Sequence, residues 1–145
     1  FSKALAIAGM RLGYAISNAA FVEQLSKIRI PYDVNSLAAV AADALLDDPA
    51  PWQAYAKEVM ERAKPIVERF FDEHGVKYYH SEANFMLVVP DDVGAATAYL
   101  QEQGILVRPQ RVPVDNAFRL SVGRPRDMQR FCQVYANYLA SRDGA

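Results

Sequence analysis

Residues 84–104, NFMLVVPDDVGAATAYLQEQG, place a strand directly before a helix. The first residues form an apolar run that ends at Pro90, which predicts a buried β-strand. Residues 92–103 then carry apolar side chains at helical spacing, and Gly104 is placed to end the helix. A strand followed so closely by a helix indicates a domain built from a sheet and helices in layers.

The alternation of elements continues on both sides of this stretch. Apolar runs predict three further short strands, at 76–80, 105–108 and 118–122, and Pro125 opens a final helix. From residue 76 the order is strand, strand, helix, strand, strand, helix. This order is typical of a two-layer α/β (α+β) unit, so we expect helices packed on a small, largely antiparallel sheet.

Upstream, the pattern predicts one short buried strand at 11–16 and then three helices. The helices should begin at Asn18, at Asn35 or Ser36, and at about Pro51. The third should run to residue 74, with a kink at Pro65 and its end at Gly75.

Composition excludes several classes of protein. The 145 residues are 52% hydrophobic, enough for one ordinary domain with a core, and the net charge of −1 excludes a general attraction to nucleic acid or anionic membrane. No apolar run approaches the roughly 18 residues of a membrane span. The single cysteine, Cys132, excludes an internal disulfide, and two histidines leave little for a metal site. We therefore expect a cytoplasmic protein, and the first residue, Phe1, favours a piece of a longer chain.

Lys3 is the first candidate for chemistry, because it lies in a loop of small and apolar residues eight positions before Arg11. Desolvation and a nearby cation would lower the pKa of Lys3, leaving a neutral amine able to form a Schiff base with an aldehyde cofactor. Ser2 and Arg11 could then hold a phosphate group. The alternative is a solvated lysine beside an ordinary surface arginine.

The segment SKALAIAGMRLGY, residues 2–14, resembles the cofactor-lysine segment of fold-type I pyridoxal-phosphate aminotransferases. Among these, it is most similar to the histidinol-phosphate aminotransferases. The resemblance implies that Lys3 is the Schiff-base lysine and general base. It also implies that Ser2 and Arg11 hold the phosphate of pyridoxal 5′-phosphate.

The likeness continues along nearly the whole chain, in the segments 31–35, 84–85, 104–108 and 118–123. It implies that Arg119 binds the acidic group of the substrate and that Arg108 assists. Independently, the fork of a guanidinium matches a planar carboxylate, and a charge between apolar neighbours needs an anion or an outward position. A side chain of Arg119 that faces outward therefore remains an alternative interpretation. Arg111 could take the assisting role in place of Arg108.

From this resemblance we expect residues 1–30 to end the large cofactor-binding domain and residues 31–145 to form the small C-terminal domain. The implied reaction transfers an amino group between histidinol phosphate and 2-oxoglutarate in histidine biosynthesis. The implied partners are an amine or amino-acid substrate, a 2-oxo acid and a second copy in a homodimer, with no nucleic acid and no membrane. These 145 residues alone are expected to be inactive.

Two other interpretations remain. The chain could belong to an aminotransferase for aromatic or other amino acids, or to a phospho-amino-acid decarboxylase of the same fold. It could also be a non-catalytic α/β binding or dimerisation module in which Lys3 and Arg11 occur at this spacing by chance.

Overall fold

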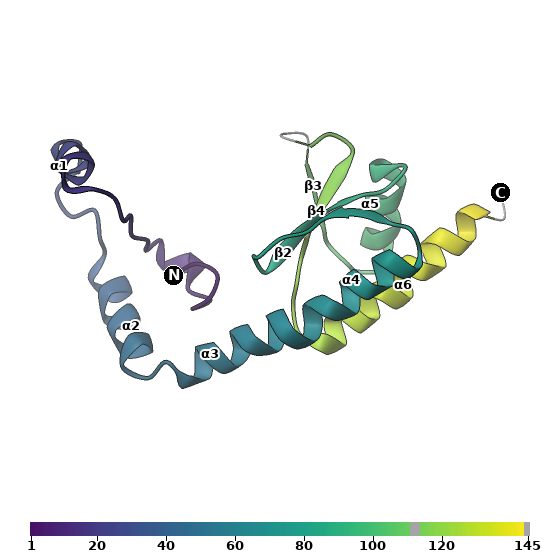
Figure 1. Ribbon diagram of the computed structural model, residues 1–145, viewed down its shortest axis with the longest axis horizontal. Helices are drawn as coiled ribbons and strands as arrows, with labels where there is room; N and C mark the ends of the chain where they lie inside the picture. Colours follow the sequence, from purple (N-terminus) through teal and green to yellow (C-terminus); the bar gives the residue numbers. More distant parts are fainter. Residues whose placement is uncertain (111–113, 144–145) are drawn as a thin grey trace. The chain divides into compact units, whose positions relative to one another are not determined.

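The computed structural model describes residues 1–110 and 114–143. The chain forms two compact units, Phe1–Ala56 and Lys57–Ala145, and each is described by itself. The predicted boundary between residues 30 and 31 is a different one, because it separates two domains of a longer protein. It stays a prediction. In chain order the helices are a 3-10 turn Ala8–Met10, α1 Ala19–Lys27, α2 Ser36–Asp47, α3 Ala50–Lys57, a π-helical segment Glu58–Ala63, α4 Lys64–Glu73, α5 Val93–Glu102 and α6 Pro125–Asp143 (Figure 1).

The second unit contains a four-stranded sheet, whose strands are β1 Lys77–Tyr79, β2 Phe85–Val89, β3 Arg108–Gln110 and β4 Ala117–Ser121. Their order in space is β1-β2-β4-β3, and every neighbouring pair is antiparallel. Helices α4 and α6 run side by side in Figure 1 and pack on each other, and α5 packs on α6, β3 and β4. The predicted architecture, helices packed on a small antiparallel sheet, is confirmed.

One face of the sheet forms the core with the helices. Along β2, Met86 and Val88 are buried while their neighbours are half-exposed, and on β4 Phe118 and Leu120 are buried beside them. The helices contribute their largest fully buried side chains to this core: Val67, Phe71, Leu100, Phe131 and Tyr135. The side chains on the opposite face of the sheet are therefore not part of this core.

Local signals in the sequence set most helix ends. Asn18, Asn35 and Asp92 each accept a hydrogen bond from a backbone N–H in the first turn of the helix that follows. Gly75 and Gly104 adopt left-handed φ angles of +63° and +73° after α4 and α5, as a Schellman ending requires. These caps confirm the predicted starts of three helices and the ends of two.

The third predicted strand, at 105–108, is displaced. After Gly104, the N–H of Ile105 still donates to the carbonyl oxygen of Leu100 at 2.8 Å, so it belongs to the end of α5. The ladder with β4 begins only at Arg108 and runs to Gln110. The prediction was wrong by three residues because the helix ending uses the first residues of the apolar run.

The predicted strand at 11–16 is wrong. Residues 12–18 have no regular secondary structure, and residues 13–18 are exposed. A strand needs a neighbour for its backbone hydrogen bonds, and the described residues of the first unit contain no strand.

Pro65 disturbs its helix in a specific way. Proline lacks the N–H that would reach the carbonyl of Glu61, and its ring crowds that carbonyl. The preceding turn widens into the π-helical segment Glu58–Ala63, in which the N–H of Lys64 donates to the carbonyl of Val59, five residues back. Pro65 is thus accommodated by a π turn that continues directly into α4.

Candidate functional site

The loop that carries Ser2 and Lys3 belongs to the first unit and is tightly turned. The N–H of Ala6 donates to the carbonyl of Lys3 at 3.1 Å, and a 3-10 turn follows before Arg11. Ala6 and Arg11 adopt φ angles of +58° and +55°, a left-handed conformation that is uncommon outside glycine. Such strain of about 1 kcal/mol per residue tends to occur where a backbone shape serves a function.

The side chains of this loop are open to solvent. Lys3 and Arg11 are exposed, Ser2 is half-exposed, and Nη1 of Arg11 donates to the carbonyl of Ala8 at 3.0 Å. The expected desolvation of Lys3 is therefore not produced by the residues that the structure describes. A Cβ placed on Gly9 or Gly13 would meet no atom within 4 Å, so open space borders the backbone at both positions.

The second pair of candidates, Arg108 and Arg119, lies in the second unit, where the two residues are register partners across β3 and β4. Leu87 on β2 is the partner of Arg119 on its other side. Directly paired residues of antiparallel strands place their side chains on the same face. Both arginines therefore share the sheet face opposite the core, and the structure brings them together as expected; Arg111 lies outside the described residues.

No carboxylate of the described residues contacts Arg119. Its Cζ lies 5.3 Å from the centre of the Phe85 ring, and its Nε is buried with no hydrogen-bond partner among the described residues. Neither Arg119 nor the exposed Arg108 forms an ion pair within the part of the chain that the structure describes. Two neighbouring cations with no acidic partner among the described residues are an arrangement that favours the binding of an anion.

Phe85 was not among the predicted site residues. Its place beside Arg119 depends on the register of β2 against β4, which pairs Phe85 with Ser121 and leaves Arg119 as its diagonal neighbour. Diagonal neighbours lie within reach of long and aromatic side chains. The sequence signal for Phe85 is its place as the apolar residue at the start of the predicted strand at 84–89. This signal identifies Phe85 as a neighbour of Arg119 only when the register of the two strands is known.

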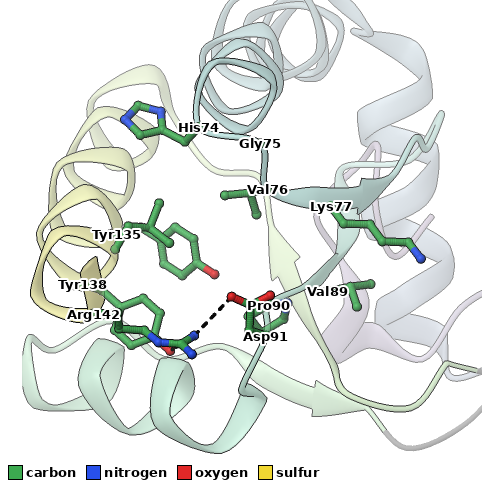
Figure 2. A pocket seen from close by; sticks show the side chains of 11 residues that line it. His74, Gly75, Val76, Lys77, Val89, Pro90, Asp91, Tyr135, Tyr138 and Arg142 are labelled. Atoms are coloured by element: carbon green, nitrogen blue, oxygen red, sulfur yellow. Dashed lines mark hydrogen bonds and ion pairs between the residues drawn. The ribbon is translucent and has the colours of Figure 1, made fainter. Parts of the chain in front are cut away.

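A small cavity of about 140 Å³ lies elsewhere in the second unit, between the ends of β1 and β2 and helix α6 (Figure 2). Across it, Nη1 of Arg142 lies 3.6 Å from Oδ2 of Asp91. The hydroxyl of Tyr135 points toward Asp91 in Figure 2 and is buried with no hydrogen-bond partner among the described residues. Burial raises the pKa of Tyr135 well above its usual range, so this hydroxyl stays protonated. None of the predicted site residues lines this cavity.

In residues 1–110 and 114–143, no three histidine, cysteine or acidic side chains are grouped so that they could hold a metal ion. No helix in the described part of the chain combines the length and the apolar character needed to cross a membrane.

Comparison with known proteins identifies relatives of the whole stretch. The histidinol-phosphate aminotransferase of Lactiplantibacillus plantarum is 40% identical over 141 residues, covering 97% of this chain and 38% of the relative. This chain therefore spans well under half the length of that protein.

Solved structures share the fold. The histidinol-phosphate aminotransferase of Sinorhizobium meliloti, in complex with pyridoxal 5′-phosphate, matches with a TM-score of 0.80 at 24% identity, over 97% of this chain and 40% of that one. The L-threonine-O-3-phosphate decarboxylase of Porphyromonas gingivalis matches with a TM-score of 0.74 at 25% identity, over 97% and 45%. The family of class I and II aminotransferases matches residues 1–134, and the chain belongs to this family.

Proposed function

We propose that this chain forms the C-terminal part of a pyridoxal-phosphate aminotransferase that transfers an amino group between histidinol phosphate and 2-oxoglutarate in histidine biosynthesis. The observation that carries the proposal is the paired Arg108 and Arg119 on one face of the sheet, without a carboxylate among the described residues. Both substrates bear an acidic group that such a pair would bind. The 40% identity to a histidinol-phosphate aminotransferase supports the choice of substrate.

The first unit fits the phosphate end of the cofactor. Residues 1–22 contain two cations, Lys3 and Arg11, and no acidic residue, so the donor set favours an anion. The hydroxyl of Ser2 and the guanidinium of Arg11 would hold the phosphate. The open space beside Gly9 and Gly13 would let backbone N–H groups approach it.

Lys3 would hold the cofactor covalently and act as the general base and acid. When bound, pyridoxal phosphate supplies an electron sink for the substrate carbon that bears the amino group. The Nζ of Lys3 would take the proton from that carbon and return a proton to the cofactor. An amine that moves protons near neutral pH must be desolvated, so closure of the loop around the ligand is part of this proposal.

Arg119 would fix the other end of the substrate, with Arg108 beside it. A guanidinium donates two parallel hydrogen bonds to a carboxylate or phosphate, which sets both position and orientation. With its acidic end held by Arg119, the substrate would be kept in one orientation for the reaction.

The proposal extends to the organisation of the whole enzyme. Residues 1–30 would complete a large cofactor-binding domain and residues 31–145 would form the small domain of a cytoplasmic homodimer. Because the chain covers 38% of its relative, the complete reaction is proposed for a protein that carries this sequence within a chain of similar length.

Reduction with borohydride tests the cofactor site. A protein of the relatives' length that carries this sequence is incubated with pyridoxal phosphate and reduced, and the modified peptide is mapped by mass spectrometry. The adduct is expected on Lys3 and on no other exposed lysine, such as Lys27. A Lys3→Ala variant that still binds the cofactor with unchanged affinity would refute the proposal and favour a non-catalytic module.

Profiling of amine donors tests the substrate. Histidinol phosphate is expected to be consumed with 2-oxoglutarate at the highest kcat/KM. A preference for aromatic amino acids, or release of carbon dioxide from a phospho-amino acid, would refute histidinol phosphate as the substrate. The family assignment would be unchanged.

A further inference from the structure

Phe85 is a neighbour of Arg119 to which the proposed chemistry assigns no role. Its ring lies under the guanidinium, with Cζ of Arg119 5.3 Å from the ring centre, inside the distance at which a cation is attracted to an aromatic face. Phe85 opens β2, pairs with Ser121, and lies on the same sheet face as Leu87 and Arg119.

This contact offsets part of the electrostatic repulsion between Arg108 and Arg119. Arg108 and Arg119 are direct partners in the ladder, and like charges in such positions repel each other. The described residues provide no carboxylate for either one, and none of them offers a hydrogen-bond acceptor to the buried Nε of Arg119. The negative face of an aromatic ring is therefore the stabilising group that the structure records next to this cation.

The contact also limits the freedom of a long side chain. An arginine in solution occupies many rotamers, and binding an acid must select one of them. A ring that holds the guanidinium before the ligand arrives removes part of that entropic cost. The core does not depend on this ring in the same way, because the buried face of β2 is formed by Met86 and Val88.

We propose that Phe85 is a positioning residue for Arg119, whose ring holds the guanidinium ready for the acidic group of the substrate. The inference rests on the proposed function, since it assigns Arg119 to acid binding. The ring stabilises the cation while no anion is bound and leaves its hydrogen-bond donors for the ligand.

The test measures acid binding directly, without cofactor, in a protein of the relatives' length that carries this sequence. The Nε–Hε signal of Arg119 is followed by NMR during titration with 2-oxoglutarate at constant ionic strength. Four chains are compared: the parent, Phe85→Leu, Phe85→Tyr and Arg119→Gln. In the last, backbone signals of β4 are followed instead. Phe85→Leu retains apolar bulk without the aromatic face, and Phe85→Tyr retains both.

In Phe85→Leu the affinity is expected to fall about two- to fivefold, with faster motion of the Arg119 side chain. Phe85→Tyr should restore both quantities to the parent's values, which a merely space-filling role would not require. In the parent, ring currents should shift the Hε signal of Arg119 upfield of the other arginines. This last observation needs no variant to fold, and its absence would by itself overturn the inference.

The outcomes separate the two proposals. If Arg119→Gln loses binding while Phe85→Leu binds as the parent does, the role of Phe85 is refuted and the acid site stands. If Arg119→Gln binds 2-oxoglutarate as tightly as the parent, the acid site itself is refuted.

Discussion

Arg108 on β3 and Arg119 on β4 are direct partners in the antiparallel ladder, so two cationic side chains share one face of the sheet. Such an arrangement lowers the stability of the empty fold and raises its affinity for an anion. The same two residues are thus expected to lower the free energy of unfolding and to strengthen the binding of an anion.

Replacing Arg108 with glutamine should separate these two contributions. Arg108→Gln is expected to raise the free energy of unfolding by about 0.5 kcal/mol, because the repulsion across the ladder disappears. It should also weaken 2-oxoglutarate binding severalfold. Urea unfolding and NMR titration measure the two effects. The control is Lys77→Gln on β1, which also removes a cation but whose ladder partner is Val89. An Arg108→Gln chain that is less stable than the parent would contradict this account.

Two lysine–glutamate pairs in the second unit allow burial to be tested at constant distance. Lys57 and Glu61 lie 3.8 Å apart with side chains 71% and 63% exposed. Lys64 and Glu68 lie 3.7 Å apart with side chains 5% and 20% exposed. The amine of Lys64 also donates to the carbonyl oxygen of Ser81.

Lys64→Met should therefore lower the free energy of unfolding by about 2 kcal/mol, because the carbonyl of Ser81 and the carboxylate of Glu68 lose a buried partner. Lys57→Met should change it by less than about 0.5 kcal/mol. Urea denaturation of both variants gives the comparison. Equal effects would mean that distance, and not burial, sets the strength of these pairs.

The two tyrosines of α6 are predicted to respond oppositely to loss of the hydroxyl. Tyr135 buries its hydroxyl without a partner among the described residues, whereas the hydroxyl of Tyr138 accepts from Arg142 at 3.3 Å and donates to the carbonyl of Asp92 at 3.5 Å. Tyr135→Phe should raise the free energy of unfolding by about 1 kcal/mol, and Tyr138→Phe should lower it by about 1 kcal/mol. Thermal unfolding measures both. A destabilised Tyr135→Phe chain would show that a water or a ligand pairs with this hydroxyl in solution.

Cys132 should be unreactive in the folded chain. Burial raises the pKa of its thiol from 9.0 to about 11, so almost no thiolate exists at pH 8. Labelling with a disulfide reagent at that pH is expected to be slow in the native chain and fast in urea. Rapid labelling without urea would contradict the burial of this side chain.

The same shift predicts a pH dependence of stability. Because the folded pKa lies above the unfolded one, the contribution of Cys132 is complete below pH 9.0 and is lost as pH rises through about 11. The difference in unfolding free energy between the parent and Cys132→Ala should therefore be constant up to about pH 9 and shrink above it. A difference that grows with pH would contradict the sign.

The parts of the fold that could be predicted are those that the local sequence controls. Asn18, Asn35 and Asp92 cap α1, α2 and α5 with their own side chains, and Gly75 and Gly104 end α4 and α5 by a φ angle that glycine favours. These choices are made within a few residues, so a single sequence reveals them.

The parts that could not be predicted depend on contacts between distant residues. The start of β3 at Arg108 follows from competition between the ending of α5 and the ladder with β4. The place of Phe85 under Arg119 follows from a strand register that no local pattern specifies. In the same way, the apolar run at 11–16 predicts a strand only if a neighbouring strand exists.

The edges of the sheet have a consequence for the behaviour of the chain at high concentration. Both edge strands, β1 and β3, are three residues long, each begins with a cation, and β3 contains Pro109, which has no N–H to donate. Short, charged and proline-bearing edges offer few backbone groups to a strand from another molecule. The sheet is therefore protected against growth into intermolecular β-aggregates, and this protection is supplied partly by Arg108, one of the two arginines proposed to bind the substrate.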